Sequence, residues 1–137
     1  MPTLIDTNVL IDLFGQETTF TPWSEKWLHA CRAEGPVAID QIIYAEMAAG
    51  FETVDELDSA LTPSRFLRES IPFEAGPVAG KAYAAYRRQG GDRRSPLPDF
   101  YVGAHALVVG HRLLTRDPAR YRTYFPAIEI IAPDTHP

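Results

Sequence analysis

The chain has 137 residues, of which 45% are hydrophobic and one is cysteine, which predicts a single domain over residues 1–137 with its own core and no internal disulfide. No apolar run is long enough to span a membrane, and Asp6 and Asp12 interrupt the opening run before it could serve as a secretory leader. We therefore expect a cytoplasmic protein without a membrane partner, and the net charge of −5 argues on average against a nucleic-acid partner.

Short apolar runs alternate with amphipathic stretches along the whole chain. In chain order the pattern predicts strand 3–6, helix 9–14, helix 22–33, strand 37–39, helix 41–49, helix 53–61, strand 70–73, helix 77–89, helix 98–109, strand 112–115 and strand 128–131. Helix ends carry the expected signals, such as Asp40 before one helix and Gly15 after another. Thr53 and Glu56 have capping-box spacing. Strands that alternate with helices indicate an α/β fold, with a mostly parallel sheet covered on both faces.

Two acids directly follow expected strands. Asp6 ends the first strand, and Asp117 stands just after the strand over 112–115. Because ligands of open α/β sheets bind outside the carboxyl ends of the strands, both acids are expected at one crevice. Each also has an ordinary explanation, since Asp6 can cap the following helix and Asp117 with Pro118 can form a turn or a helix start. Taken singly, neither acid identifies a site.

Two further acids fall on expected helices. Glu46 shares a helical face with Ile42 and Ala45, so we expect its carboxylate in the apolar stripe, where an unpaired charge is costly. A buried salt bridge is the ordinary explanation, but the chain has two lysines and few arginines before residue 87. Asp99 stands in the first turn of its helix, where the helix dipole alone would favour an acid.

Carboxylates that converge on one crevice repel each other unless a cation neutralises them. Oxygen ligands in this small number suit Mg²⁺ or Mn²⁺ better than Ca²⁺, and one Cys with four scattered His gives no zinc-site spacing. Two such ions can activate a water and stabilise the leaving oxygen in phosphodiester cleavage. The candidate catalytic and metal-binding residues are Asp6, Glu46, Asp99 and Asp117. His105 shares a helix with Asp99, and we expect it to pack or to meet solvent.

The charge distribution favours a nucleic-acid partner more than the net charge does. Residues 1–80 carry a net charge of −9, whereas residues 81–122 carry +6. Arginines supply most of the second value, and a basic segment of this kind can face phosphates. The candidate RNA contacts are Arg93, Arg94 and Arg116. The alternative interpretation is a solvated helix end and loop.

The same residues resemble the four motifs of PIN-domain nucleases. The opening LIDTNVLID (residues 4–12) is similar to the first motif, IYAE (43–46) to the second, PDFYVGAHA (98–106) to the third and LTRD (114–117) to the fourth. Their order and spacing are similar over nearly the whole chain, and a lone short PIN domain looks most like the VapC-type toxins of prokaryotic toxin–antitoxin pairs. The resemblance implies a PIN-like three-layer α/β/α sandwich.

The resemblance also implies function. It implies a metal-dependent endoribonuclease that cuts RNA with Mg²⁺ or Mn²⁺, forms a homodimer and is inhibited by a cognate antitoxin protein. Asn8 and Thr115 match polar positions that help to hold water or metal in the family, and Asp12 is expected on the helix surface or behind the site.

Three alternatives stay open. A phosphoryl-accepting, Mg-binding α/β domain also gathers acids at strand ends, but no lysine follows residue 81 to contact a phosphoryl group. A PIN scaffold that binds RNA or protein without catalysis is the second, and the presence of all four acids argues against it. A flap or DNA nuclease is the third, and the short chain offers no added DNA-binding module for it.

Overall fold

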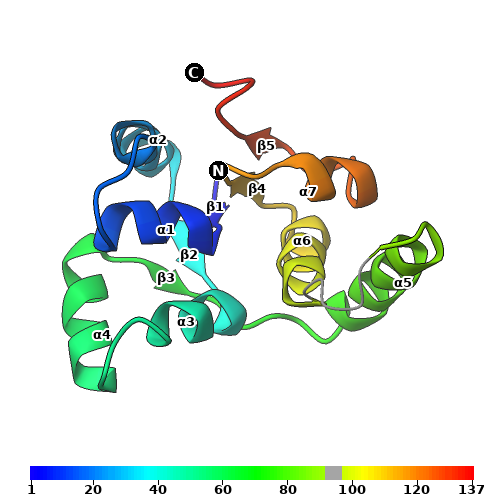
Figure 1. Cartoon of the computed structure of the whole chain (residues 1–137), viewed down its shortest axis with the longest axis horizontal. Helices are drawn as coiled ribbons and strands as arrows, with labels where there is room; N and C mark the ends of the chain where they lie inside the picture. Colours follow the sequence, from blue (N-terminus) through cyan, green and yellow to red (C-terminus); the bar gives the residue numbers. More distant parts are fainter. Residues whose placement is uncertain (92–96) are drawn as a thin grey trace.

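The structure is a computed structural model that describes residues 1–91 and 97–137. These residues form seven α-helices, one 3₁₀ helix and a five-stranded sheet (Figure 1). The elements are β1 (Thr3–Ile5), α1 (Thr7–Phe14), α2 (Thr21–Glu34), β2 (Val37–Ile39), α3 (Gln41–Ala48), α4 (Val54–Leu61), the 3₁₀ helix η1 (Thr62–Ser64), β3 (Leu67–Arg68), α5 (Ala75–Arg88), α6 (Leu97–Val109), β4 (Arg112–Leu114), α7 (Ala119–Tyr124) and β5 (Ile130–Ile131).

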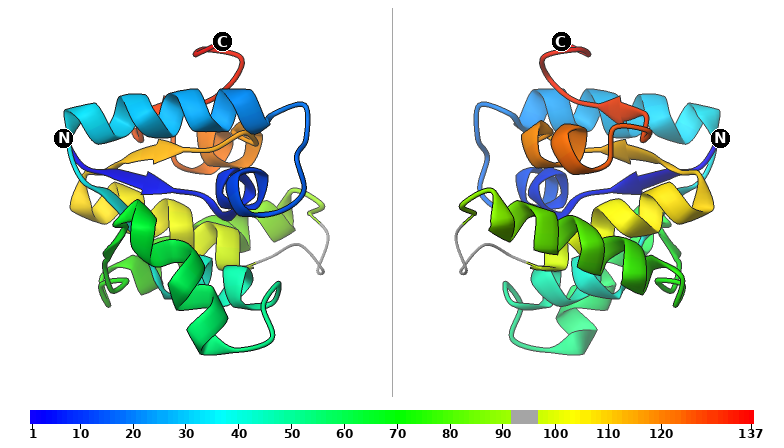
Figure 2. Two further views of the ribbon diagram at one scale, coloured as in Figure 1. Left: turned by 90° about the vertical axis from the view of Figure 1, so that its left-hand side faces the viewer. Right: turned by 90° about the vertical axis from the view of Figure 1, so that its right-hand side faces the viewer.

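The sheet has the strand order β3-β2-β1-β4-β5, and all four pairings between its strands are parallel. Helices α1 and α2 lie on one side of it and α5 and α6 on the other, which confirms the predicted three-layer α/β/α sandwich (Figure 1). Figure 2 shows β1 and β4 pointing toward the same side of the molecule. Residues that directly follow these strands therefore meet at one edge of the sheet.

Side-chain caps explain where several helices begin. The Asp6 carboxylate accepts a hydrogen bond from the Thr7 backbone N–H, so α1 begins at residue 7, earlier than the sequence predicts. Asp40 caps α3 and Thr53 caps α4, both as predicted. The capping box is only half formed, because the Glu56 carboxylate accepts from the backbone N–H of residue 52 and not from that of Thr53.

Three elements differ from the prediction. No strand forms over residues 70–73, where Pro72 lacks an N–H and the Ile71 N–H donates to the side chain of Gln41. The edge strand is instead the exposed pair Leu67–Arg68, and two residues are too few to show the hydrophobic alternation that predicts a strand. The last strand is shortened to Ile130–Ile131, and helix α7 was not predicted at all.

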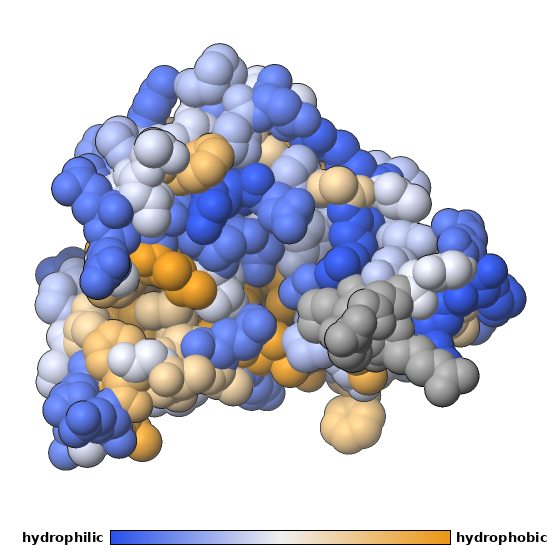
Figure 3. Space-filling view, viewed as in Figure 1, coloured by the Kyte–Doolittle hydropathy of each residue, from blue (hydrophilic) through white to orange (hydrophobic). Residues whose placement is uncertain are grey.

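The core lies between the sheet and its two helical layers. Leu4 and Ile5 of β1, Leu113 and Leu114 of β4 and Phe100 of α6 are completely buried. Burial on both faces explains why the last two residues of β1 and of β4 are all apolar. None of the helices formed by the described residues has the length and apolar character that a membrane span requires. In Figure 3 the upper part of the face is mostly hydrophilic, whereas apolar residues gather at its lower left, over α3 and α4.

Candidate functional site

The four acids singled out from the sequence line one cavity of about 510 Å³ at the carboxyl edge of the sheet. Asp6 follows β1, Glu46 projects from α3, Asp99 lies in the first turn of α6, and Asp117 follows β4. Parallel strands and the antiparallel course of α6 bring these positions together although 111 residues separate the first from the last. The predicted convergence is therefore present in the structure.

Asp6 is the most firmly held of the four carboxylates. Its Oδ1 accepts from the Thr7 backbone N–H at 2.8 Å. Its Oδ2 accepts from the Thr115 hydroxyl at 2.9 Å, the Tyr121 hydroxyl at 3.0 Å and the Asn8 amide at 3.2 Å. Both predicted polar residues, Asn8 and Thr115, thus contact the first acid directly. Four donors fix the carboxylate in one orientation.

Burial and like charge oppose the ionised form of two of these acids. Burial raises the pKa of Asp6 to about 6, and the negative charge of Asp99 adds to this although three donors lower it. Burial also raises the pKa of Asp99, with contributions from the charges of Glu46 and Asp117, against the opposing effect of Arg120. Among the described residues, the carboxylates of the cavity are therefore only partly balanced by positive charge.

Glu46 lies on a different face of its helix from the one predicted. The buried face of α3 carries Ile43 and Met47, not Ile42 and Ala45, so Glu46 is exposed to the cavity and does not lie in an apolar stripe. The prediction chose the wrong helical face because α3 has apolar residues on more than one side. The Glu46 carboxylate accepts a hydrogen bond from the Thr7 hydroxyl at 2.8 Å.

Asp99 has a basic partner that the sequence analysis did not predict. The Arg120 Nη1 lies 2.6 Å from its Oδ2, and each side chain is 32% exposed. This arginine comes from α7, which follows the fourth acid in the chain. Arg120 also lies over the rings of Tyr86 and Phe100, at 5.3 and 5.9 Å from their centroids.

The loop after β4 presents the fourth acid. The Asp117 backbone N–H donates to the Thr115 hydroxyl at 3.1 Å, and the Arg116 backbone N–H donates to the Asn8 side chain at 3.1 Å. These bonds tie the loop to the start of α1 and leave the Asp117 side chain exposed in the cavity. Asn8 and Thr115 therefore hold the first acid and position the fourth.

The basic candidates are only partly described. Arg93 and Arg94 lie outside the described residues. The Arg116 side chain turns away from the cavity, with its Nε 2.8 Å from the buried carboxylate of Asp12 and its guanidinium over the ring of Phe20. Asp12 is buried and also accepts from the Ser24 hydroxyl, so it lies behind the site and not on the helix surface. An RNA contact through Arg116 would need that ion pair to open.

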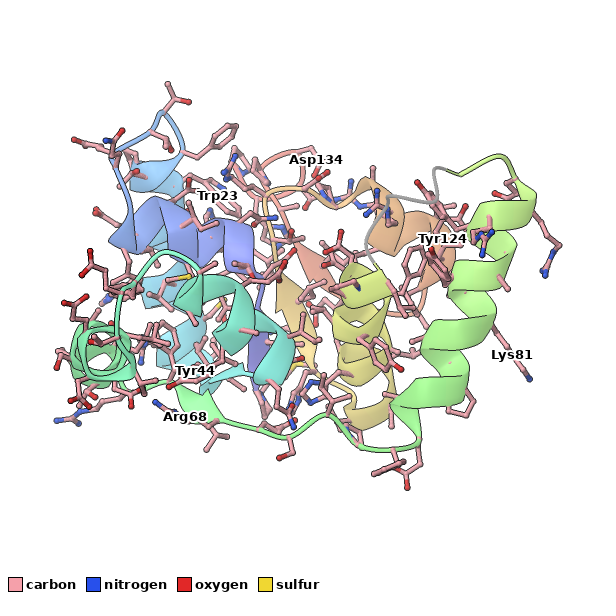
Figure 4. The ribbon with its side chains drawn as sticks, turned by 60° about the horizontal axis from the view of Figure 1, so that its bottom comes forward. Trp23, Tyr44, Arg68, Lys81, Tyr124 and Asp134 are labelled. Carbon is pink, nitrogen blue, oxygen red and sulfur yellow. The ribbon has the colours of Figure 1, made fainter. Side chains whose placement is uncertain are left out.

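Several cavity residues were missed from the sequence. They are Thr7, Tyr86, Arg120, Tyr121 and Tyr124. Thr7 stood within the first motif, but the tyrosines and Arg120 come from helices whose cavity-facing sides had no recognisable pattern. Tyr124 points from α7 toward α5, where its hydroxyl donates to Gln89 at 3.0 Å (Figure 4).

The donor set fits a hard divalent cation, although the cavity is not yet arranged around one. Within residues 1–91 and 97–137, no group of three or more His, Cys, Asp or Glu side chains is placed to hold a metal ion. Hydroxyls and N–H groups of the protein hold Asp6, and the Arg120 guanidinium holds Asp99. Among the described residues, four carboxylates and one cation, Arg120, line the cavity, and this leaves negative charge of the kind that Mg²⁺ or Mn²⁺ neutralises.

A second acid-rich cluster lies outside the cavity. The completely buried His105 contacts Asp40 through Nδ1 at 2.9 Å and Glu69 through Nε2 at 2.8 Å, and Glu69 also contacts His111 at 2.9 Å. Burial lowers the pKa of His105, but its bonds to Asp40 and Glu69 outweigh burial and raise it overall. Between the two expectations for His105, the structure selects packing, with both ring nitrogens paired.

Comparisons with known proteins place these features in one family. The family described as PIN domain matches residues 3–126. The structure is similar to that of VapBC2 from Rickettsia felis bound to a DNA fragment from its promoter, with 16% identity, a TM-score of 0.75 and coverage of 96% of this chain and 98% of that chain. VapBC-1 from nontypeable Haemophilus influenzae gives 19% identity, a TM-score of 0.70 and coverage of 96% and 98%.

A toxin–antitoxin complex from Klebsiella pneumoniae gives 23% identity, a TM-score of 0.61 and coverage of 94% of this chain and 95% of that chain. No protein of curated function matches the sequence significantly. At these identities the structural likeness shows the fold. The family match covers most of the sequence and includes all four acids.

Proposed function

This chain belongs to the PIN domain family, and we propose that it is a metal-dependent endoribonuclease that hydrolyses RNA phosphodiester bonds. The observation that carries the proposal is the convergence of Asp6, Glu46, Asp99 and Asp117 on one open cavity. A stable fold gains nothing from placing four acids together, because each disfavours the ionised form of its neighbours. Perturbed acids in a cleft are a recognised mark of a functional site.

The proposed cofactor is Mg²⁺ or Mn²⁺, held by these four carboxylates. When bound, such ions supply an activated water and neutralise the charge that develops on the phosphoryl and leaving oxygens. The chain's own residues prepare the ligands. Thr115 and Tyr121 fix the Asp6 carboxylate, and Thr7 fixes that of Glu46. Oriented carboxylates lose less freedom when a cation binds, which favours a defined site.

A single-stranded RNA suits the cavity walls. Tyr86, Tyr124 and Arg120 line the side away from β1, and unpaired bases commonly stack on aromatic and guanidinium groups. The basic segment over residues 81–122 would lie along the strand entering the cavity, with Arg93 and Arg94 as the proposed phosphate contacts. We assign no RNA contact to Arg116 while it is paired with Asp12.

The biological role that we infer is that of the toxin of a type II toxin–antitoxin pair. Structures of similar fold include a toxin–antitoxin complex from Klebsiella pneumoniae and two VapBC complexes. The proposed partners are therefore a cognate antitoxin, an RNA substrate and a second copy of this chain. An antitoxin that inserts a basic side chain among the four carboxylates would neutralise the charge that otherwise recruits the metal.

Cleavage of a labelled RNA by the purified protein tests the activity. We expect cleavage with Mg²⁺ or Mn²⁺, no cleavage in excess EDTA, and recovery when the metal is restored. Undiminished cleavage in EDTA would overturn the metal mechanism. Binding of RNA without cleavage under any divalent cation would favour the non-catalytic scaffold.

Expression in bacteria tests the biological role. The wild-type chain alone should arrest growth with loss of RNA, and the cognate antitoxin should relieve the arrest. Asp99→Asn is the matched control, because it removes a proposed metal ligand whose side chain is partly exposed in the cavity. An Asp99→Asn variant as toxic as the wild type would show that the phenotype has another source.

A further inference from the structure

Arg120 is the one cation among the described residues that line the cavity, and it is paired with a proposed metal ligand. Its Nη1 donates to the Asp99 Oδ2 at 2.6 Å. A divalent ion that takes this carboxylate as a ligand and a guanidinium that donates to its Oδ2 compete for its negative charge, and for Oδ2 itself where the ion uses that oxygen. The ion pair therefore opposes metal binding as long as it is closed.

The surroundings of Arg120 allow the guanidinium to move without its helix. The neighbouring Tyr121 is buried and bonded to Asp6, and Phe125 is buried in the core, so these residues anchor the backbone of α7. The guanidinium itself is partly exposed and lies over the rings of Tyr86 and Phe100. Contacts of this kind with ring faces are weakly directional, so a small rotation of the side chain retains them.

A substrate phosphate is a fitting alternative partner for this arginine. A guanidinium binds phosphate and carboxylate with the same planar fork of N–H donors, so exchanging one anion for the other keeps the hydrogen bonds. The cavity that would receive the substrate is the one that Arg120 lines. The substrate phosphate would thus replace Asp99 as the partner of Arg120, and the Asp99 carboxylate would become free to bind the metal.

We propose that Arg120 is a resident counter-ion that holds Asp99 in the metal-free protein and passes to an RNA phosphate when substrate enters, so that RNA and metal bind cooperatively. The inference rests on the proposed function. It makes Arg120 a positioning residue that sets when the metal site completes. By linkage, RNA tightens metal binding by the same factor by which metal tightens RNA binding. The ion pair would keep the metal affinity of the free protein low until RNA is present.

The affinity for Mn²⁺ alone tests the first half of the proposal, measured by electron paramagnetic resonance of the free ion. Arg120→Gln frees Asp99 and should bind Mn²⁺ about tenfold more tightly than the wild type, the change expected when one charge-assisted hydrogen bond no longer competes. Arg122→Gln is the matched control. It removes the same charge from the same helix, but Arg122 pairs with the exposed Asp134, 2.8 Å from Nη2 to Oδ1, and not with a cavity acid.

A non-hydrolysable RNA tests the second half. The probe is a short RNA in which methylene replaces the bridging oxygen cleaved at each phosphate. We expect it to tighten Mn²⁺ binding by the wild type about tenfold, and by Arg120→Gln several-fold less, because the variant has no ion pair for the phosphate to open. Arg120→Met is a second variant that keeps an apolar stem against Tyr86 and Phe100, and it should behave as Arg120→Gln does.

The outcomes separate this inference from the proposed function. Tighter Mn²⁺ binding by Arg120→Gln than by Arg122→Gln, with the smaller response to the RNA analogue, supports the inference. Equal Mn²⁺ affinities in the two variants would overturn it while leaving the metal site intact. Failure of the wild type and of both Arg120 variants to bind Mn²⁺ would overturn it together with the proposed function.

Discussion

Two acid clusters at the carboxyl edge of the same sheet differ in how their charge is balanced. In the cavity, Arg120 is the one cation lining the described walls beside four carboxylates. In the cluster around His105, the two carboxylates of Asp40 and Glu69 face two imidazoles. Each cluster takes two of its acids from positions just after strands, Asp6 and Asp117 in the cavity and Asp40 and Glu69 around His105, so this position in the fold does not distinguish them.

The pKa values show what the difference means. Burial would raise the pKa of Glu69, but hydrogen bonds from His111 and His105 outweigh it and lower the pKa overall. Burial raises the pKa of Asp6 to about 6, and the charge of Asp99 adds to it. A buried acid is thus a structural partner where counter-charges are built in, and a candidate ligand where they are missing.

The largest expected effect comes from removing one cavity acid. Asp99→Asn should lower the rate of RNA cleavage by about a thousandfold, because the missing metal ligand removes several kcal/mol of transition-state stabilisation. The assay compares initial rates at saturating Mg²⁺. Asp134→Asn is the control, since this acid is exposed and pairs with Arg122 outside the cavity, and its rate should stay within about twofold of the wild type. Equal reductions in the two variants would contradict the assignment.

The next largest effect concerns stability. His105→Ala should lower the free energy of unfolding by about 3 kcal/mol, because it removes the imidazole that pairs with the buried Asp40 and leaves His111 as the one imidazole beside Glu69 among the described residues. Urea unfolding followed by circular dichroism measures the change. Cleavage per folded molecule should remain, because no atom of this cluster lines the cavity. A loss of activity without a loss of stability would place His105 in the site.

The balanced cluster also predicts how stability depends on pH. The pKa of His105 is raised from its usual 6.5, so its contribution is complete below pH 6.5 and is lost as the pH rises through the raised value. The pKa of Glu69 is lowered from 4.5, so its contribution is complete above pH 4.5 and is lost as the pH falls through the lowered value. Unfolding at several pH values should therefore show the largest advantage of wild type over His105→Gln between about pH 4.5 and 6.5. A constant difference from pH 5 to pH 9 would refute this.

The smallest effect tests the basic segment. Replacing Arg93 and Arg94 by Ala should weaken binding of an uncleaved RNA on the Asp99→Asn background. The slope of log K against log salt concentration should fall by about 0.7 for each phosphate that the variant no longer neutralises. The Mg²⁺ requirement of the otherwise wild-type enzyme should be unchanged. An unaltered slope would show that neither arginine contacts an RNA phosphate and would favour the solvated-surface interpretation.

Sequence reasoning predicted the elements that carry local signals. The caps at Asp40 and Thr53 and the glycine after α1 mark helix ends through single hydrogen bonds or backbone geometry. Strand β3 was missed because its two exposed residues have no strand pattern of their own. They form a strand because they pair with β2, which is a tertiary effect. Helix α7 was missed because six residues show too little periodicity to identify.

The site divides in the same way. Acids at strand ends were predictable, since topology fixes where parallel strands end. The partner of Asp99 was not, because the Arg120 side chain reaches it from an unpredicted helix. The face of α3 that carries Glu46 was misassigned, because alanines and isoleucines surround the helix and several faces look apolar. Side-chain pairing across distant segments is what one sequence does not reveal.

The most direct test of the unbalanced cavity is the shift of melting temperature on adding Mn²⁺ to the metal-free protein. A ligand that binds only the folded state stabilises it in proportion to the logarithm of its concentration above Kd. We expect a clear rise for the wild type, an equal rise for His105→Ala from its lower starting point, and little or none for Asp99→Asn. No rise in the wild type, or the same rise in Asp99→Asn, would contradict the assignment of the cavity as a metal site.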